Sequence, residues 1–155
     1  MSGKLREVTI VFLRRDKSIL LAMKKRGFGA GHWNGAGGKP EPGEAIIDTA
    51  RRECFEEIAV TPGKLDKVAE INFYSQGKPG DDQQAHVYFC YGWAGEPTET
   101  EEMRPQWFDI DTIPYDSMWA DDIYWLPVVL SGKKIEANFY FDANNQVADH
   151  QIKVL

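Results

Sequence analysis

Three glutamates, Glu53, Glu56 and Glu57, lie one to four residues apart in a segment whose apolar spacing predicts a helix. At about 100° per residue, their side chains share roughly one quadrant of the helix surface. Carboxylates this close repel one another and disfavour each other's ionisation unless a cation lies between them. Mg²⁺ prefers oxygen ligands, keeps several waters, and commonly links protein carboxylates to substrate phosphates. The spacing therefore indicates a divalent-metal site, with a solvated acidic face as the alternative.

The residues that flank the glutamates favour the metal site. The glycine-rich run 35–38 lets backbone approach a ligand closely, and a turn at Pro42 and Gly43 comes shortly before the helix. Arg52 lies between the carboxylates and can orient them through charge-assisted hydrogen bonds. Apolar residues at spacings of three and four predict a second helix face that packs on a sheet. This stripe consists of Ile47, Ala50, Cys54 and Ile58.

The rest of the chain contains the elements that must position this site. Two apolar runs, 9–13 and 18–23, flank a polar turn and predict a hairpin. Residues 121–130 predict a second helix. β-Branched and aromatic runs predict further strands at 67–74, 85–93, 106–110, 135–141 and 146–154, with turns at 77–82 and 142–145. This mixture of strands and two helices predicts an α/β sandwich that forms a single domain over residues 1–155.

Residues 38–60 resemble the Nudix box, in which a glycine, a glutamate, an Arg-Glu pair, a Glu-Glu pair and an aliphatic residue follow at fixed spacing. The matching positions are Gly38, Glu44, Arg52, Glu53, Glu56, Glu57 and Val60. Cys54 replaces an aliphatic residue, and cysteine behaves as a small hydrophobe. Ala59 replaces a glycine, which affects only the helix end, where a left-handed residue is usually glycine. The resemblance implies an α/β/α sandwich with a mixed sheet, and hydrolysis of a nucleoside diphosphate linked to another group.

Three further segments, 23–35, 101–108 and 118–125, resemble the MutT-homologue enzymes that hydrolyse oxidised purine nucleoside triphosphates. The resemblance implies a substrate-binding set of Thr9, Lys24, Phe28, Asn34, Trp119, Asp121 and Asp122. It implies that the substrate is a purine nucleoside triphosphate such as 8-oxo-dGTP. It also adds Glu102 to the metal shell.

Each member of this set has an implied role. Asn34, Asp121 and Asp122 would hydrogen-bond the edge of the base, while Trp119 and Phe28 would stack on the base or wall it. Thr9 and Lys24 would lie at the nucleoside. Two adjacent aspartates in a closed pocket should repel, so one is expected to stay protonated and act as a donor. The alternative is that both aspartates are N-cap and first-turn residues of the second helix.

The predicted reaction is cleavage to the nucleoside monophosphate and pyrophosphate by a metal-activated water. The metal is expected to be Mg²⁺, with Mn²⁺ as a substitute. The predicted metal shell is Gly37, Gly38, Glu53, Glu56, Glu57 and Glu102, and the predicted catalytic set is Arg52, Glu53, Glu56, Glu57 and Glu102. Glu53 and Glu102 are both candidates for the general base. Glu44 and Arg52 are expected to brace the loop against the helix.

Several of these residue types also have commoner roles. Trp107 and Trp125 are expected in the core, and Trp119 alone at the base. The basic run 24–26 is either a solvated strand end or a phosphate site. The three histidines lack metal-ligand spacing, so core or surface positions are expected for them. Residues 74–78 are more polar than expected from the resemblance, which leaves the base preference open.

The composition of the chain restricts the classes of molecule that it is expected to bind. The chain has 155 residues, a net charge of −6 and a pI near 5.1, which argue against a nucleic-acid partner and for a small nucleotide. No apolar run is long enough to span a membrane, and residues 1–7 lack the apolar core of a secretory signal. Cys54 and Cys90 are expected to be buried, reduced thiols. A cytoplasmic monomer is therefore expected.

Two other functions remain open on the sequence. A Nudix enzyme could instead hydrolyse a nucleotide sugar, a dinucleotide or an ordinary nucleoside triphosphate. A nucleotide-binding module without turnover is the second alternative, although a pure binder would not need all three helix glutamates.

Overall fold

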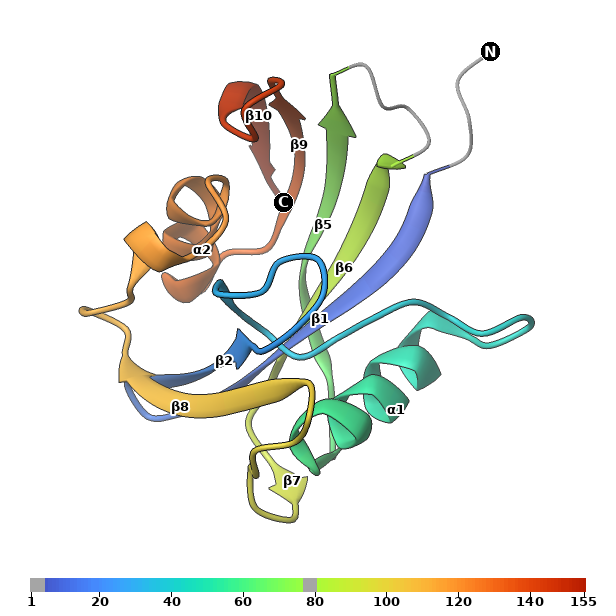
Figure 1. The fold of residues 1–155 in the computed structure, drawn as a ribbon. Helices are drawn as coiled ribbons and strands as arrows, with labels where there is room; N and C mark the ends of the chain where they lie inside the picture. The colour runs from blue at the N-terminus through green and yellow to red at the C-terminus, as the bar shows by residue number, and fades with distance from the viewer. Residues whose placement is uncertain (1–4, 77–80) are drawn as a thin grey trace.

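In the computed structural model, residues 5–76 and 81–155 are described. Within them, eight strands form one sheet in the order β10-β9-β5-β6-β1-β2-β3, with β8 also paired to β2 (Figure 1). These strands are β1 (Arg6–Arg15), β2 (Ser18–Lys24), β3 (Trp33–Asn34), β5 (Asp66–Ser75), β6 (Gln83–Cys90), β8 (Met103–Asp109), β9 (Ile135–Phe141) and β10 (Val147–Val154). The sheet is mixed because β1 pairs with β6, and β5 with β9, in parallel, whereas the other pairs are antiparallel.

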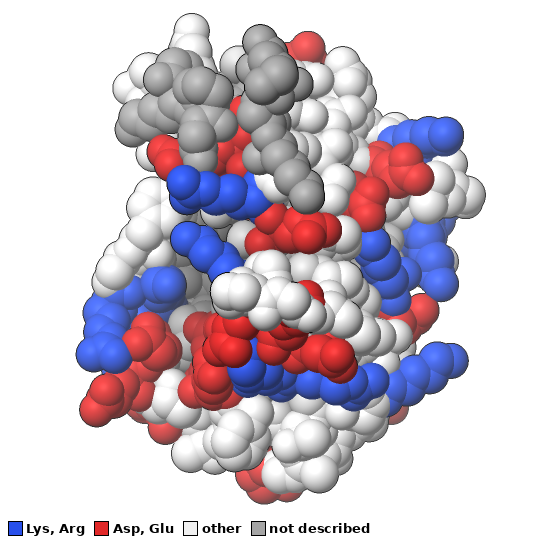
Figure 2. All heavy atoms as spheres, turned by 90° about the vertical axis from the view of Figure 1, so that its right-hand side faces the viewer, with Lys and Arg blue, Asp and Glu red and all other residues white. Residues whose placement is uncertain are grey.

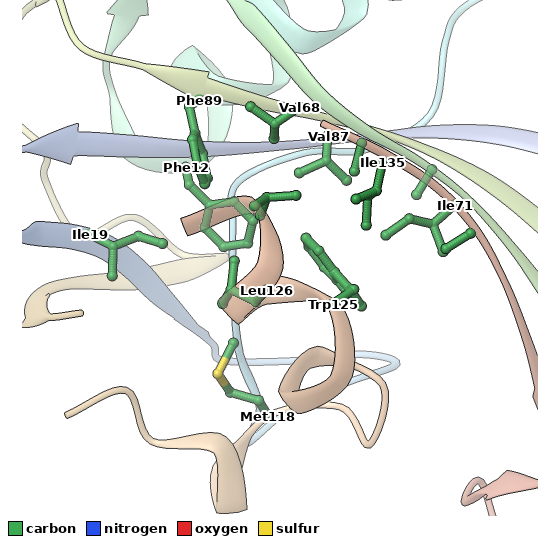
Figure 3. Close-up of a cluster of buried hydrophobic side chains, with 14 of the residues drawn as sticks. Phe12, Ile19, Val68, Ile71, Val87, Phe89, Met118, Trp125, Leu126 and Ile135 are labelled. Carbon is green, nitrogen blue, oxygen red and sulfur yellow. The ribbon is translucent and has the colours of Figure 1, made fainter. Parts of the chain in front are cut away.

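One helix covers each face of the sheet, so the layering is α/β/α (Figure 1). Helix α1 (Ile46–Ile58) and helix α2 (Asp122–Leu130) pack on separate hydrophobic clusters. Successive strand residues alternate between the clusters, as the two-residue period of a strand requires. In β1, Val11 and Leu13 join the α1 cluster, whereas Phe12 joins the α2 cluster beside Trp125 (Figure 3).

The predicted hairpin is confirmed, but its two strands diverge. β1 and β2 pair only near the turn, at Arg14 with Ile19 and Arg15 with Ser18. Farther from the turn, residues 36–38 take the edge of β1, where the backbone of Ala36 bonds Val11 in both directions. The glycine-rich run is therefore fixed by backbone hydrogen bonds to a central strand.

Helix α1 buries the face predicted from its spacing, with one exception. Ala50, Cys54 and Ile58 are fully buried, but Ile47 is 40% exposed, so its placement in the buried stripe was wrong. Ile47 lies in the first turn of the helix, beyond the apolar cluster that the later turns contact. At the other end, Ala59 adopts a left-handed conformation with φ of 62°, and its N–H bonds the carbonyl of Phe55.

Most predicted elements are confirmed, with shifted ends. The predicted strand 85–93 ends at Cys90, and Trp93 belongs to a separate short pair, β4 (Thr61–Pro62) with β7 (Trp93–Ala94). The second helix begins at Asp122 instead of Asp121, after a 3-10 turn at Tyr115–Ser117. The short strands β3, β4 and β7 were not predicted. The predicted turn at 77–82 lies largely outside the described residues.

Two expectations about the described chain can be compared with the structure directly. Cys54 and Cys90 are both buried free thiols, as expected. Over residues 5–76 and 81–155, neither helix combines the length and apolar character that a membrane span requires.

Candidate active site

The glycine loop lies between β1 and the glutamates of α1. Thr9 is buried, its N–H donates to the Gly38 carbonyl at 2.9 Å, and its hydroxyl accepts from the Gly38 N–H at 3.3 Å. A Cβ at Gly37 would collide with the Thr9 backbone, and a Cβ at Gly38 would collide with the Glu53 carboxylate. Glycine is required here because the backbone approaches both neighbours so closely.

Arg52 ties this loop to the helix. Its guanidinium donates to both Glu44 carboxylate oxygens, at 2.9 and 3.0 Å, and to the Lys39 carbonyl at 3.0 Å. It also bonds Glu53 at 2.8 Å and Glu56 at 3.2 Å. The Arg52 bonds and a bond from the Thr49 hydroxyl lower the pKa of Glu44 to about 2. The bracing expected of Glu44 and Arg52 agrees with this geometry.

Glu57 is the most buried of the three helix glutamates. It is 8% exposed, and one of its carboxylate oxygens accepts the Gly37 N–H at 2.8 Å. Burial raises the pKa of Glu57 to about 7, and the charge of Glu53 adds to the shift. Burial also raises the pKa of Glu53, although Arg52 opposes that shift. Loss of hydration therefore perturbs these carboxyls more than their mutual repulsion does.

Glu102 and the basic run 24–26 lie beside this cluster. Arg26 pairs with Glu102, and Lys25 pairs with Glu99, so both cations are neutralised by neighbouring carboxylates. The Lys24 charge opposes the rise in the pKa of Glu57 that burial causes, and it adds to the lowering of the Glu102 pKa, which is due chiefly to the hydrogen bond from Arg26. The structure thus distinguishes Lys24, at the carboxylates, from two residues that form surface ion pairs.

Acidic and basic side chains lie next to each other on the face that carries α1 (Figure 2). The ion pairs of Arg52 with Glu44, Glu53 and Glu56 belong to this pattern. Among the described residues, no group of three or more acidic, histidine or cysteine side chains is arranged so that it could hold a metal ion. The side-chain donors of Glu53, Glu56, Glu57 and Glu102 are nevertheless all oxygens, the ligand type that a hydrated Mg²⁺ shared with phosphates prefers.

A second group of predicted residues meets at Trp119. The Trp119 ring stacks on Phe28 with centroids 5.3 Å apart, and on His32 with centroids 4.4 Å apart. Asn34 follows in β3, where its side-chain oxygen accepts the Gly35 N–H at 2.8 Å. Phe28 and His32 therefore lie against Trp119, although they are far from it in sequence. The contribution of His32 was missed, because contact across 87 positions leaves no local pattern.

Asp121 and Asp122 are both buried, at 4% and 3% exposure. Asp121 accepts the indole N–H of Trp125 at 2.7 Å, and its side chain makes no capping bond within the described residues. The alternative is therefore confirmed in position, since Asp121 is the N-cap residue of α2 and Asp122 lies in its first turn, although the Asp121 carboxylate accepts from Trp125 in place of a helix N–H. One Asp122 oxygen, Oδ2, has no hydrogen-bond partner among the described residues. Burial raises the pKa values of both carboxyls, and the Asp121 charge raises that of Asp122 further.

Comparisons with known proteins agree with this arrangement. The oxidized purine nucleoside triphosphate hydrolases of Danio rerio and Mus musculus are 44% and 43% identical to this chain, over 94% of it and 92% of their own lengths. The crystal structure of a MutT protein from Bacillus halodurans superposes with a TM-score of 0.84, covering 96% of this chain and 98% of that one. At 24% identity, that likeness concerns the fold alone. The NUDIX domain family matches residues 3–129, which contain the glycine loop, Arg52 and the helix glutamates, and the chain is therefore a member of the Nudix hydrolases.

Proposed function

We propose that this enzyme hydrolyses oxidised purine nucleoside triphosphates such as 8-oxo-dGTP to the nucleoside monophosphate and pyrophosphate. The names of the two relatives with more than 40% identity support this substrate class. The net charge of −6 supports a small nucleotide over a nucleic acid, whose phosphates require clustered cations.

The observation that carries the substrate proposal is the buried pair Asp121 and Asp122 beside Trp119. A buried carboxyl oxygen without a partner is costly unless a ligand satisfies it. With raised pKa values, one carboxyl of the pair holds a proton near neutral pH, so the pair can both donate and accept. An oxidised guanine offers both an added N7 hydrogen and an 8-oxo group along one edge. Asn34 would add its amide nitrogen as a donor.

The carboxylates beside the glycine loop would hold the metal ion. Glu53, Glu56 and Glu57 are the proposed ligands, with backbone oxygen from Gly37 or Gly38 and with Glu102 after it leaves Arg26. When bound, a divalent ion screens the phosphate charge and lowers the pKa of an attacking water. Nudix hydrolases generally use such an ion, and we propose Mg²⁺, with Mn²⁺ as a substitute.

The remaining residues would position substrate and carboxylates. Arg52 and Glu44 hold the loop 37–44 against α1, which keeps Glu53 facing Gly38. Lys24 would neutralise charge on the phosphates, because its ammonium already acts on Glu57 and Glu102. Thr9, which bonds Gly38 through its N–H and its hydroxyl, would fix the position of the loop relative to β1 beside the nucleoside. Glu53 or Glu102 would accept the proton of the attacking water.

A phosphate-release screen tests the proposal. The protein is incubated with Mg²⁺, inorganic pyrophosphatase and either oxidised or ordinary purine nucleoside triphosphates, a nucleotide sugar or a dinucleotide. We expect turnover of 8-oxo-dGTP to exceed that of dGTP and to stop in EDTA. Equal turnover of dGTP, or preference for another diphosphate, would remove the oxidised-purine assignment. Tight nucleotide binding without turnover would instead indicate a binding module.

A further inference from the structure

His32 lies flat against the ring of Trp119. The two ring planes differ by only 7°, with centroids 4.4 Å apart, which is the closest and most parallel of the stacking contacts that Trp119 makes. Phe28 also stacks on Trp119, but at 28°, and it is 82% exposed. A ring that is itself exposed to water constrains its neighbour weakly, so His32 provides the better-defined support.

The backbone around His32 is fixed by its own hydrogen bonds. The His32 N–H donates to the Gly29 carbonyl at 3.1 Å, and the His32 carbonyl accepts the Lys24 N–H at 3.1 Å. Gly27, Gly29 and Gly31 all have φ between 78° and 88°, which lets this short connection between β2 and β3 fold back on itself. A Cβ at Gly29 would press on the Trp119 ring, so glycine also admits the indole.

The imidazole ring is fixed as well. Nδ1 of His32 lies 3.2 Å from the Gly29 carbonyl, a contact in which the ring nitrogen must be the donor. This bond fixes the rotation of the ring about its own axis. The flat face presented to Trp119 is therefore set by the loop and not by Trp119 itself.

We propose that His32 is a positioning residue that holds the indole of Trp119 in the orientation needed to stack on a purine base. This inference rests on the proposed function, because it assumes that Trp119 contacts the base. Trp119 is only half-buried and precedes α2 in an irregular segment, so its ring needs a tertiary contact to fix its rotamer. Binding a base to a preoriented ring avoids the entropy cost of ordering that ring during binding.

The effect should appear in substrate binding and not in the chemical step. Within residues 5–76 and 81–155, neither His32 nor Trp119 forms a hydrogen bond or an ion pair with the carboxylates of α1. Loss of one aromatic contact of this kind corresponds to an affinity loss of about 2- to 12-fold. We therefore expect His32→Ala to raise KM for 8-oxo-dGTP by that factor while kcat changes less than twofold. The Kd of the product, 8-oxo-dGMP, measured by calorimetry, should rise by a similar factor.

A double-mutant cycle separates positioning from direct contact or general stability. His32→Ala, Trp119→Ala and the double variant are compared, and we expect the double variant to bind no more weakly than Trp119→Ala alone. His32→Phe keeps a flat ring and should stay within about twofold of wild type. His150→Ala is the matched control, since His150 also stacks flat on an aromatic ring, Phe139, at 7°.

Two outcomes would overturn the inference. Additive losses in the double variant would mean that His32 acts independently of Trp119. An unchanged KM and Kd in His32→Ala, in an enzyme that still prefers 8-oxo-dGTP, would mean that Trp119 is oriented without it. A wild-type enzyme that does not prefer 8-oxo-dGTP over dGTP would instead refute the proposed function. That result requires only the wild-type measurement, so the two failures are distinguishable.

Discussion

Glu57 combines burial, a raised pKa and a backbone hydrogen bond to the glycine loop. Glutamine at this position can still accept the Gly37 N–H but is a poor metal ligand and carries no charge. We expect Glu57→Gln to lower kcat at least about a hundredfold, the scale of losing a group that acts on transition-state charge. Steady-state kinetics at saturating Mg²⁺ checks this, with the exposed Glu136→Gln as control. Near-normal turnover would contradict the assignment of Glu57 to the metal site.

The same substitution should change how stability depends on pH. The folded-state pKa of Glu57 is about 7, above its ordinary 4.5, so Glu57 contributes fully to stability below about 4.5 and loses that contribution as pH rises through 7. In EDTA, Glu57→Gln should therefore match wild type near pH 4.5. At pH 8 it should be more stable by about 1 to 3 kcal/mol. Urea unfolding at both pH values checks this, and a difference that shrinks with rising pH would contradict it.

Substitutions at Asp121 and Asn34 test recognition of the base separately from the hydrolysis step. Asp121→Asn replaces one carboxyl of the buried pair by an amide, which cannot exchange a proton with Asp122, and Asn34→Ala removes the proposed amide donor. Each should reduce discrimination between 8-oxo-dGTP and dGTP by about 1 to 3 kcal/mol, mainly through KM. Because Asp121 also accepts the Trp125 N–H, the melting temperature must be recorded alongside. If both variants keep the wild-type preference and the same Mg²⁺ dependence, the pocket belongs to other residues.

At the scale of elements, α1 ends on a residue that is not suited to its conformation. Ala59 holds a φ of 62°, a left-handed conformation in which a Cβ is strained. Ala59→Gly should therefore raise the free energy of unfolding by roughly 0.5–1 kcal/mol, or about 1 to 4 °C in Tm. Thermal unfolding checks this. The contrasting control is Ala50→Gly, the same substitution inside α1, which should lower Tm.

The site between the glycine loop and α1 exists because strands β1 and β2 diverge. An edge of β1 left open by β2 is taken by residues 36–38, whose backbone groups complete the ladder. This brings Gly37 and Gly38 against the carboxylates of α1. A continuous hairpin, as the two apolar runs predict, would leave no edge for the loop.

At the scale of the whole molecule, the reactivity of the two cysteines measures whether α1 stays packed on the sheet. Cys54 lies on α1 and Cys90 on β6, and both belong to the cluster between helix and sheet. Burial raises the pKa of Cys54 to about 12 and also raises that of Cys90. Neither thiol should react with a disulfide reagent until α1 separates from the sheet. Labelling rates measured across a urea series should rise with unfolding, and rapid labelling of native protein would contradict this packing.

The local patterns of the sequence predicted most of the secondary structure and the acidic face of α1. The glutamates and Arg52 lie within about two turns of one helix, so their spacing alone predicts that they lie close together. β-Branched and aromatic runs predicted the major strands, because these residue types pack well on a pleated sheet surface. Short pairs such as β4 with β7 were missed, since two residues carry no period.

The tertiary structure decided the contacts between residues that lie far apart in the chain. Whether Ile47 is buried depends on where the apolar cluster beneath α1 ends. The support of Trp119 by His32 depends on a loop that folds back through three left-handed glycines. The sequence, with its resemblance to the Nudix enzymes, determined which residues are proposed to bind metal and base. Only the fold decided their burial, and burial sets their pKa values and hydrogen bonding, because loss of water depends on every segment packed around a group.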